Sequence, residues 1–246
     1  TVYTATVTPS STSTTPSVVV AANKFTDGAG NNNSSASNTY NWTHDAVVPT
    51  MTLTCSAVAD GGSHNAAVTM TFTSSEATSN FVSGDVTLSN ATLSSWNTSA
   101  APVYKATITP SADGTVQVSV AANKFTDAVG NNNSASSPNP YDWTHDGTAP
   151  TMTITCSAVA DGGTHNAAVT MTFTSSEATG NFVVGDVTAT NASLGSWSAV
   201  SSTVYTATVT PSSANTTPSV VVAANKFTDG AGNNNSSASN TYNWTH

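Results

Sequence analysis

The chain has 246 residues, and only 7% of them are charged, against roughly 25% in a typical soluble domain. Thirteen acidic residues stand against four Lys and no Arg, so the net charge is -9. With so few cations, binding to nucleic acid or to anionic lipid has no electrostatic basis. No apolar run is long enough to cross a bilayer, so we expect no membrane insertion in this segment. The acidic balance favours cation binding, or serves solubility alone.

A repeat of 101 residues organises the chain. Trp42, Trp143 and Trp244 recur at this spacing, as do Cys55 and Cys156. A self-similarity of this kind is typical of tandem arrays. The sequence therefore predicts the C-terminal half of one repeat followed by two complete repeats: residues 1–44, 45–145 and 146–246.

A second, longer period lies behind the first. Residues 203–246 reproduce residues 1–44 except that Ala214 replaces Thr12 and Asn215 replaces Ser13. The intermediate copy is more divergent, so the full period is 202 residues. We therefore expect a longer array or a filament in which the chain associates with itself head to tail. The half-repeat is completed either by the same polypeptide or by a neighbouring subunit, and the sequence favours the same polypeptide.

Apolar residues of one repeat alternate with Thr and other polar residues, as in half-buried β-strands. Asp60-Gly61-Gly62 predicts a tight turn. Seven short strands in about 100 residues favour an all-β, immunoglobulin-like seven-strand sandwich, and tandem copies predict a rod. The seven predicted strands are 51–55, 68–73, 86–88, 93–96, 103–108, 116–120 and 141–143. Their expected core contains Phe72, Trp96, Tyr104, Phe125 and Trp143.

Several phrases of the repeat occur in a familiar order. They are Ala149–Thr153, Val169–Phe173, Ser176–Ala178, Ala224–Asp229 and Ala231–Asn233. In this order they resemble the bacterial Ig-like repeat of large surface adhesins and biofilm-associated proteins. The resemblance covers the whole chain. It implies a cell-surface stalk that projects a binding tip and is often made rigid by calcium.

Catalysis is not expected. The five His residues occupy only two positions of the repeat, and nothing marks the orienting group or the oxyanion site that a catalytic triad needs. They are His44, His145 and His246 beside the linkers, and His64 and His165 in a loop. Residues copied into every repeat serve the fold more often than chemistry, so we expect no enzyme.

One Cys occurs in each repeat, at Cys55 and Cys156. Its alternation with Met51 and Leu53 points its side chain toward the core, where a free thiol acts as a small apolar group. The alternative is a disulfide between neighbouring chains. The favoured interpretation is the buried thiol.

Carboxylates are expected to gather where repeats join. In such a sandwich the linker, the end of the second strand and the start of the last loop lie at one pole. The predicted calcium ligands are Asp45, Glu76 and Asp127 in one copy, and Asp146, Glu177 and Asp229 in the next. Calcium takes 6–8 oxygen ligands, and Asn131 or Asn233 could add amide oxygens. The alternative is a solvated acidic pole in which Lys124 or Lys226 pairs with the following Asp.

Asn-x-Ser/Thr triplets are frequent, and they predict glycosylation of an exposed surface that has few charges. The candidate sites are Asn41, Asn90, Asn97, Asn132, Asn191, Asn215 and Asn243. In a chain this rich in Asn, Ser and Thr, several triplets arise by chance, and that alternative stays open.

These patterns favour an extracellular or cell-surface structural stalk or filament built of tandem Ig-like repeats. The alternative is an adhesin module that binds a glycan or a protein through its loops. Such a module predicts loops that vary between copies, whereas here the loops are nearly the same.

Overall fold

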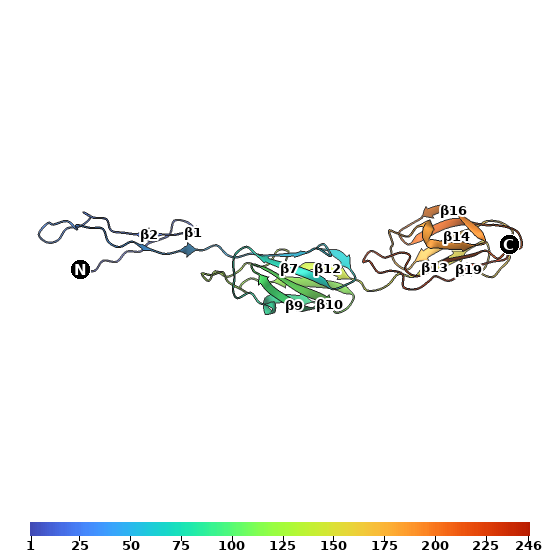
Figure 1. Cartoon of the computed structure of the whole chain (residues 1–246), viewed down its shortest axis with the longest axis horizontal. Helices are drawn as coiled ribbons and strands as arrows, with labels where there is room; N and C mark the ends of the chain where they lie inside the picture. Colours follow the sequence, from blue (N-terminus) through green and yellow to red (C-terminus); the bar gives the residue numbers. More distant parts are fainter.

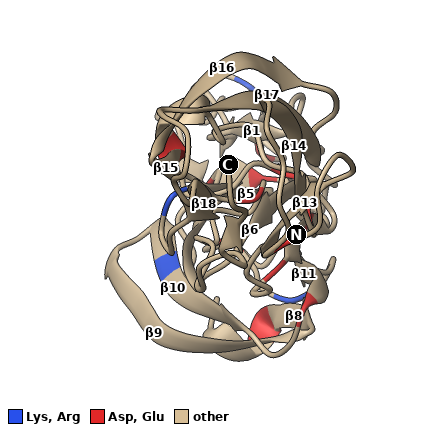
Figure 2. Ribbon diagram, turned by 90° about the vertical axis from the view of Figure 1, so that its right-hand side faces the viewer, with Lys and Arg blue, Asp and Glu red and all other residues tan.

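A computed structural model describes all residues, 1–246. Figure 1 shows an elongated molecule in which an extended N-terminal segment is followed by two β-sandwiches, with the termini at opposite ends. The ribbon positions of charged residues are sparse when the molecule is viewed end-on (Figure 2). No helix of the structure has the length and apolar character that spanning a membrane requires.

The first sandwich contains all seven predicted strands, each within a few residues of its expected range. In five of these strands alternate residues are apolar and buried, as Met51 and Leu53 show in the first of them. In the strands at 86–89 and 91–100 the larger apolar residues are half-buried. The elements are β5 (Met51–Cys55), β6 (Gly62–His64), β7 (Val68–Ser74), η1 (Ser83–Asp85), β8 (Val86–Ser89), β9 (Ala91–Ala100), β10 (Val103–Pro110), β11 (Gly114–Val120) and β12 (Tyr141–His145).

Two four-stranded sheets form this sandwich, in the orders β5-β7-β10-β9 and β6-β12-β11-β8. Without β6, these orders are those of the two sheets in a constant-type immunoglobulin domain. The predicted tight turn at residues 60–62 is present, since Gly62 N donates to the carbonyl of Ala59 at 2.9 Å. Gly62 also begins β6, a strand that was not predicted and that pairs in parallel with β12. Gly61, at φ 76°, makes the turn. The sequence signal for β6 is weak because this strand has only three residues and no apolar side chain.

The second sandwich repeats the first with sheets β13-β14-β17-β16 and β15-β18-β19. An isolated parallel bridge between Thr164 and Thr245 stands in the place of the β6–β12 pair. Its elements are β13 (Met152–Cys156), β14 (Val169–Ser175), η2 (Val184–Asp186), β15 (Val187–Thr190), β16 (Ala192–Ala199), β17 (Val204–Pro211), β18 (Ser219–Val222) and β19 (Tyr242–Asn243).

Each sandwich encloses its own core of 16 buried apolar residues. Of the expected aromatic core, four side chains are buried and Trp96 is half-buried against them. Phe81, which was not predicted, lies at the centre of the aromatic group, with its ring centroid 5.0–6.1 Å from those of four other rings. Edge-to-face packing of this kind adds stability beyond the area that it buries.

Residues 1–44 do not form the three strands that the half-repeat predicts. The first nine residues contain no strand, and only pairs of residues pair further on: β1 (Ser13–Thr14) with β4 (His44–Asp45), and β2 (Ser17–Val18) with β3 (Tyr40–Asn41). The physical reason is that a half sandwich has no opposing sheet on which to bury its apolar face.

Candidate metal centre at the repeat junctions

The structure brings each predicted trio of carboxylates together at the N-terminal pole of a sandwich. One oxygen from each of Asp45, Glu76 and Asp127 lies within 4.8 Å of the others, and the second sandwich repeats the arrangement. The linker supplies the first carboxylate, the chain after β7 the second, and the loop between β11 and β12 the third. The second trio is Asp146, Glu177 and Asp229.

Asp127 is held rigidly inside its loop. Its Oδ1 accepts hydrogen bonds from the backbone N–H groups of Val129, Gly130 and Asn131 at 2.8–2.9 Å. The Asn131 side chain donates both to Asp127 Oδ2 at 2.8 Å and to the carbonyl of Asp45 at 3.0 Å, which ties the loop to the linker. Burial opposes ionisation of Asp127, but these hydrogen bonds outweigh it and lower the pKa. Asp127 is therefore an anion at neutral pH.

The predicted amide ligands face the site differently from the expectation. The amide nitrogens of Asn131 and Asn233, rather than their oxygens, point to the carboxylates. The oxygen of Asn233 already accepts a hydrogen bond from Asn65 of the preceding sandwich, at 3.1 Å. These amides orient the carboxylates and connect repeats, and the carboxylates themselves are the candidate ligands.

Glu76 and Glu177 are the carboxyl groups of the two clusters whose pKa is raised. Burial, followed by the negative charges of Asp45 and Asp127, raises the pKa of Glu76. Burial also raises the pKa of Glu177, as do Asp146 and Asp229. The Oε1 atom of Glu76 is buried and has no hydrogen-bond partner, an arrangement that native proteins rarely leave unexplained. A cation in either cluster would offset the repulsion between the carboxylates, and in the first cluster it would also give the buried Glu76 oxygen a partner.

A buried Asn holds the loop that carries the third carboxylate. Asn133 Oδ1 accepts the backbone N–H groups of Lys124 and Phe125, and its Nδ2 donates to the carbonyls of Ala121 and Ser134. Asn235 does the same in the second sandwich and is wholly buried. Neither residue was singled out from the sequence as structural. The signal was present, since an Asn follows the repeated Phe by eight residues in all three copies, at Asn33, Asn133 and Asn235.

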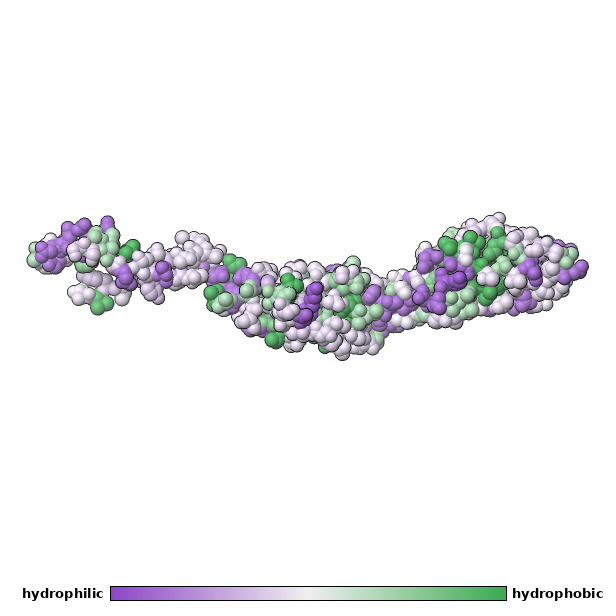
Figure 3. Space-filling view, viewed as in Figure 1, coloured by the Kyte–Doolittle hydropathy of each residue, from purple (hydrophilic) through white to green (hydrophobic).

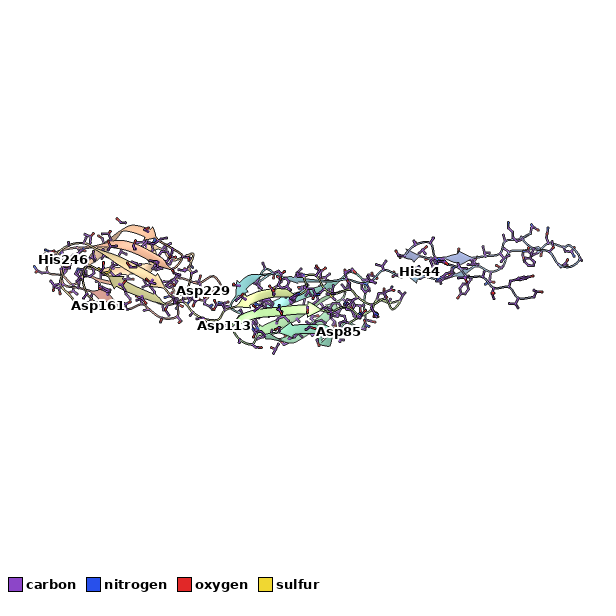
Figure 4. All side chains as sticks on the ribbon, turned by 180° about the vertical axis from the view of Figure 1, so that it is seen from behind. His44, Asp85, Asp113, Asp161, Asp229 and His246 are labelled. Carbon is purple, nitrogen blue, oxygen red and sulfur yellow. The ribbon has the colours of Figure 1, made fainter.

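The junction between the two sandwiches has a further clamp, made by Asp113 of the first sandwich. Its carboxylate accepts hydrogen bonds from Gly147 N at 2.7 Å and from the Thr148 hydroxyl at 3.0 Å, and it lies 3.7 Å from the His145 ring. Figure 4 shows Asp113 and Asp229 at this junction, from opposite sandwiches. The hydrogen bond from Gly147 is the largest influence on Asp113 and lowers its pKa.

The junction before the first sandwich lacks this clamp. Ala46 and Val47 stand where the second junction has Gly147 and Thr148, and Ala46 N donates instead to the carbonyl of Thr12. A side chain at Gly147 would place its Cβ 3.3 Å from the Asp113 carboxylate. The two junctions therefore differ in the residues that form the clamp: Gly147 and Thr148 contact Asp113 at the second junction, and Ala46 and Val47 replace them at the first.

The Lys residues do not neutralise the carboxylate clusters. The one ion pair within 4.0 Å in the structure is that of His145 with Asp113. The alternative in which Lys124 or Lys226 pairs with the Asp three residues later is therefore wrong in its pairing. No basic side chain offsets the charge of either trio.

The repeated His and Cys residues take structural positions. The rings of His145 and His246 contact the backbone carbonyls of His64 and His165, each at 3.2 Å. This contact joins the end of each repeat to its own early segment. His64 is the last residue of β6, so its predicted loop position is wrong. Cys55 and Cys156 are free and half-buried, and they pack against the cores of their sandwiches.

The predicted glycosylation sites differ in accessibility. Five are exposed: Asn41, Asn97, Asn132, Asn191 and Asn215. Asn90 and Asn243 are half-buried, and the Asn90 amide donates to the carbonyl of Ala112 at 2.9 Å. A triplet also starts at Asn235, but its amide is buried and fully hydrogen-bonded, so it offers no site for a sugar in the folded chain.

Two copies of one sandwich, each with an acidic trio at its pole, define the chain as a tandem array of Ig-like modules. The chain belongs to the bacterial Ig-like domain family, whose model matches residues 45–143 and 146–245. No curated protein sequence matches this chain.

Solved structures of low similarity accompany this family match. Invasin, a bacterial integrin-binding protein, has a TM-score of 0.38 and 16% identity over 85% of this chain and 48% of its own. InvD of Yersinia pseudotuberculosis has a TM-score of 0.33 and 17% identity over 80% of this chain and 56% of its own. The N-terminal part of the bacterial S-layer protein SbsC has a TM-score of 0.25 and 14% identity, over 82% and 45%. The chain thus spans about half the length of the invasin structure.

Proposed function

We propose that the chain is a section of an extracellular structural stalk at the cell surface, and that calcium stiffens its junctions. The observation that carries the proposal is the pair of carboxylate trios at successive junctions, each including a residue of the linker. Family membership and the elongated arrangement of Figure 1 support the mechanical role. The role proposed is to span distance, and it involves no catalysis.

Calcium fits the donor set. Carboxylate oxygens are hard ligands, and three carboxylates supply three to six of the 6–8 oxygens that calcium takes, with waters and carbonyls completing the shell. The carboxylate oxygens lie within 4.8 Å of one another, so their negative charges repel and oppose ionisation of the whole trio. A divalent cation would turn this repulsion into attraction and would tie the linker to its sandwich.

Glycans on the exposed Asn residues are part of the proposal. The surface offers few charges to hold water, and sugars at Asn41, Asn97 or Asn132 would project from exposed positions. Mass analysis of the native protein, before and after enzymatic removal of N-glycans, tests this part independently of calcium.

Calcium titration of the full chain by calorimetry tests the metal sites. We expect two sites, of which Glu76→Gln removes one and Glu177→Gln the other. Asp142→Asn is the matched control: it also removes one negative charge, and Asn already occupies the corresponding position 243. Two sites lost only in the cluster variants support the proposal. The proposal is contradicted if millimolar calcium gives no heat of binding, or if all three variants lose calcium binding equally.

Solution scattering with and without a chelator tests the mechanical consequence. We expect the maximum dimension to be larger and better defined in calcium, and the chain to sample bent forms in chelator. The same profile in both conditions would contradict stiffening even if calcium binds.

The adhesin alternative predicts instead that the loops bind a glycan or a protein saturably, which glycan or protein arrays would detect.

A further inference from the structure

A pocket opens on the first sandwich, and none of the acidic trio lines it. It lies between the segment that joins β7 to β8 and the hairpin that joins β9 to β10. Its volume is about 500 Å³, which is in the range of small-molecule sites in proteins. Aromatic residues and hydroxyl groups line it, and none of its lining residues is charged. The corresponding place in the second sandwich holds no pocket.

Aromatic side chains form the floor and one wall of the pocket. Phe81 and Tyr104 are each 3% exposed, whereas Trp96 is half-buried. The Tyr104 ring stacks against the Trp96 ring, with 5.9 Å between their centroids, and so fixes its orientation. The indole N–H of Trp96 makes no hydrogen bond within the chain and, unlike those of Trp143 and Trp244, is not buried. The pocket therefore offers a rigid apolar surface with one free donor.

Free hydroxyl groups surround this aromatic surface in the first sandwich only. Ser79, Ser83 and Thr98 are exposed, and their hydroxyls make no hydrogen bond within the chain. The second sandwich keeps the aromatic residues but has no hydroxyl at these three positions. One lining residue changes in the opposite direction, from Ala101 to Ser202. The residues that replace the three hydroxyl-bearing ones are Gly180, Val184 and Ala199.

The hairpin of the second sandwich closes over the equivalent space. The Ser202 carbonyl accepts the Thr179 N–H at 2.8 Å, and Thr179 is 4% exposed. Thr78, its counterpart in the first sandwich, is half-buried. Residues 97–102 of the first hairpin differ from residues 198–203 at all six positions. Variation between copies is what a binding module predicts, and here it accompanies an open pocket.

We propose that this pocket binds a neutral carbohydrate, one pyranose ring of which packs against Trp96. The C–H groups on one face of a pyranose ring are apolar and pack well on an aromatic ring. The sugar hydroxyls need both donors and acceptors, and a Ser or Thr hydroxyl provides both. A charged ligand fits less well, because the lining carries no charge and the net charge of -9 disfavours anions. The inference stands whether or not calcium binds at the junctions.

A second copy of this chain is a poorer occupant. Its second sandwich exposes Val183, Val184 and Val200, by 53%, 39% and 64%. Figure 3 shows hydrophobic patches on both sandwiches within a surface of mostly intermediate hydropathy. A surface of Val side chains would cover the aromatic floor but would leave the hydroxyls of Ser83 and Thr98 without partners, which costs free energy once water is excluded. A sugar satisfies the same hydroxyls.

Nuclear magnetic resonance of the full chain, produced without glycans, tests the proposal through the indole N–H signals of its five Trp residues. The probes are the methyl glycosides of glucose, galactose, mannose and N-acetylglucosamine. We expect at least one of them to shift the Trp96 signal saturably at millimolar concentration, while the Trp197 signal does not move. The proposal is overturned if no probe gives a saturable shift, or if Trp96 and Trp197 shift equally.

A double variant, Ser83→Val with Thr98→Ala, gives the first pocket the residues with which the second sandwich folds. We expect it to weaken sugar binding by about 10-fold or more, because two hydrogen-bonding hydroxyls are lost. Ser94→Gly is the matched control. It also removes a hydroxyl from β9 and installs the residue of the second sandwich, Gly195, but Ser94 does not line the pocket. Equal weakening by the double variant and by the control would count against the site.

Two further measurements separate the other occupants. Glucuronate should bind more weakly than the methyl glucoside, and tighter binding of glucuronate would overturn the choice of a neutral ligand. Without sugar, the Trp96 signal should not change over a 100-fold range of protein concentration. A shift that grows with concentration and is absent in the double variant would assign the pocket to a second copy and would overturn the proposal.

Discussion

Asn235 offers the sharpest test of what stabilises the loop that carries Asp229, the third carboxylate of the second trio. Its side chain is wholly buried and makes four hydrogen bonds to backbone: it accepts from Lys226 N and Phe227 N at 2.7 and 3.1 Å, and it donates to Ala223 O and Ser237 O at 2.8 and 3.1 Å. Asn235→Ala removes all four. A typical hydrogen bond contributes about 1 kcal/mol net, so the expected loss is about 3–4 kcal/mol.

For a sandwich of about 100 residues, each kcal/mol shifts Tm by roughly 4–8 °C. We therefore expect calorimetry of the full chain to show one transition lowered by at least about 12 °C, with the first sandwich unaffected. Asn234→Ala is the control, because Asn234 is adjacent, exposed and makes no side-chain hydrogen bond. The equivalent Asn33→Ala should lower neither transition. Equal effects of Asn235→Ala and Asn234→Ala would refute the assignment of stability to this buried network.

Three further predictions concern pH, the junction and the core. The pKa of Glu177 is raised by folding from its usual 4.5, so in chelator its stabilising contribution is present below pH 4.5 and is lost as pH rises through the folded value; Glu177→Gln should remove that dependence in pH-dependent unfolding. Calcium must displace this proton, so binding should weaken on acidification. Asp113→Ala should speed amide exchange at Gly147 without changing exchange in either core. Phe227→Ala should cost about 3–5 kcal/mol in denaturant unfolding, whereas Phe25→Ala should cost close to nothing; equal costs would contradict the exposed position of Phe25.

The strands and the core residues could be predicted from the sequence because the alternation of apolar and polar residues is a local pattern. Alternation of Val68, Met70 and Phe72 with Thr predicts a strand with one buried face, and the structure buries that face. Repetition at 101 residues makes each inference from one copy hold for the next. The acidic trios were also accessible to sequence reasoning, because the order of strands in an Ig-like sandwich decides which ends share a pole.

Tertiary structure decided what depends on contacts between distant residues. Strand β6 has three residues and no apolar pattern, so only its pairing with β12 defines it. Whether Asn131 faces the site with its oxygen or its nitrogen depends on the Asp45 carbonyl, 86 positions away.

The two nearly identical segments show the division most directly. Residues 1–44 and 203–246 share almost every side chain, and their loops close in the same way because those hydrogen bonds are local. Only residues 203–246 bury Tyr205 and Phe227, because a strand face becomes a core only when an opposing sheet excludes water from it. The sequence by itself therefore determines the strand pattern and the loop, and the covering half-sandwich decides whether they become a domain.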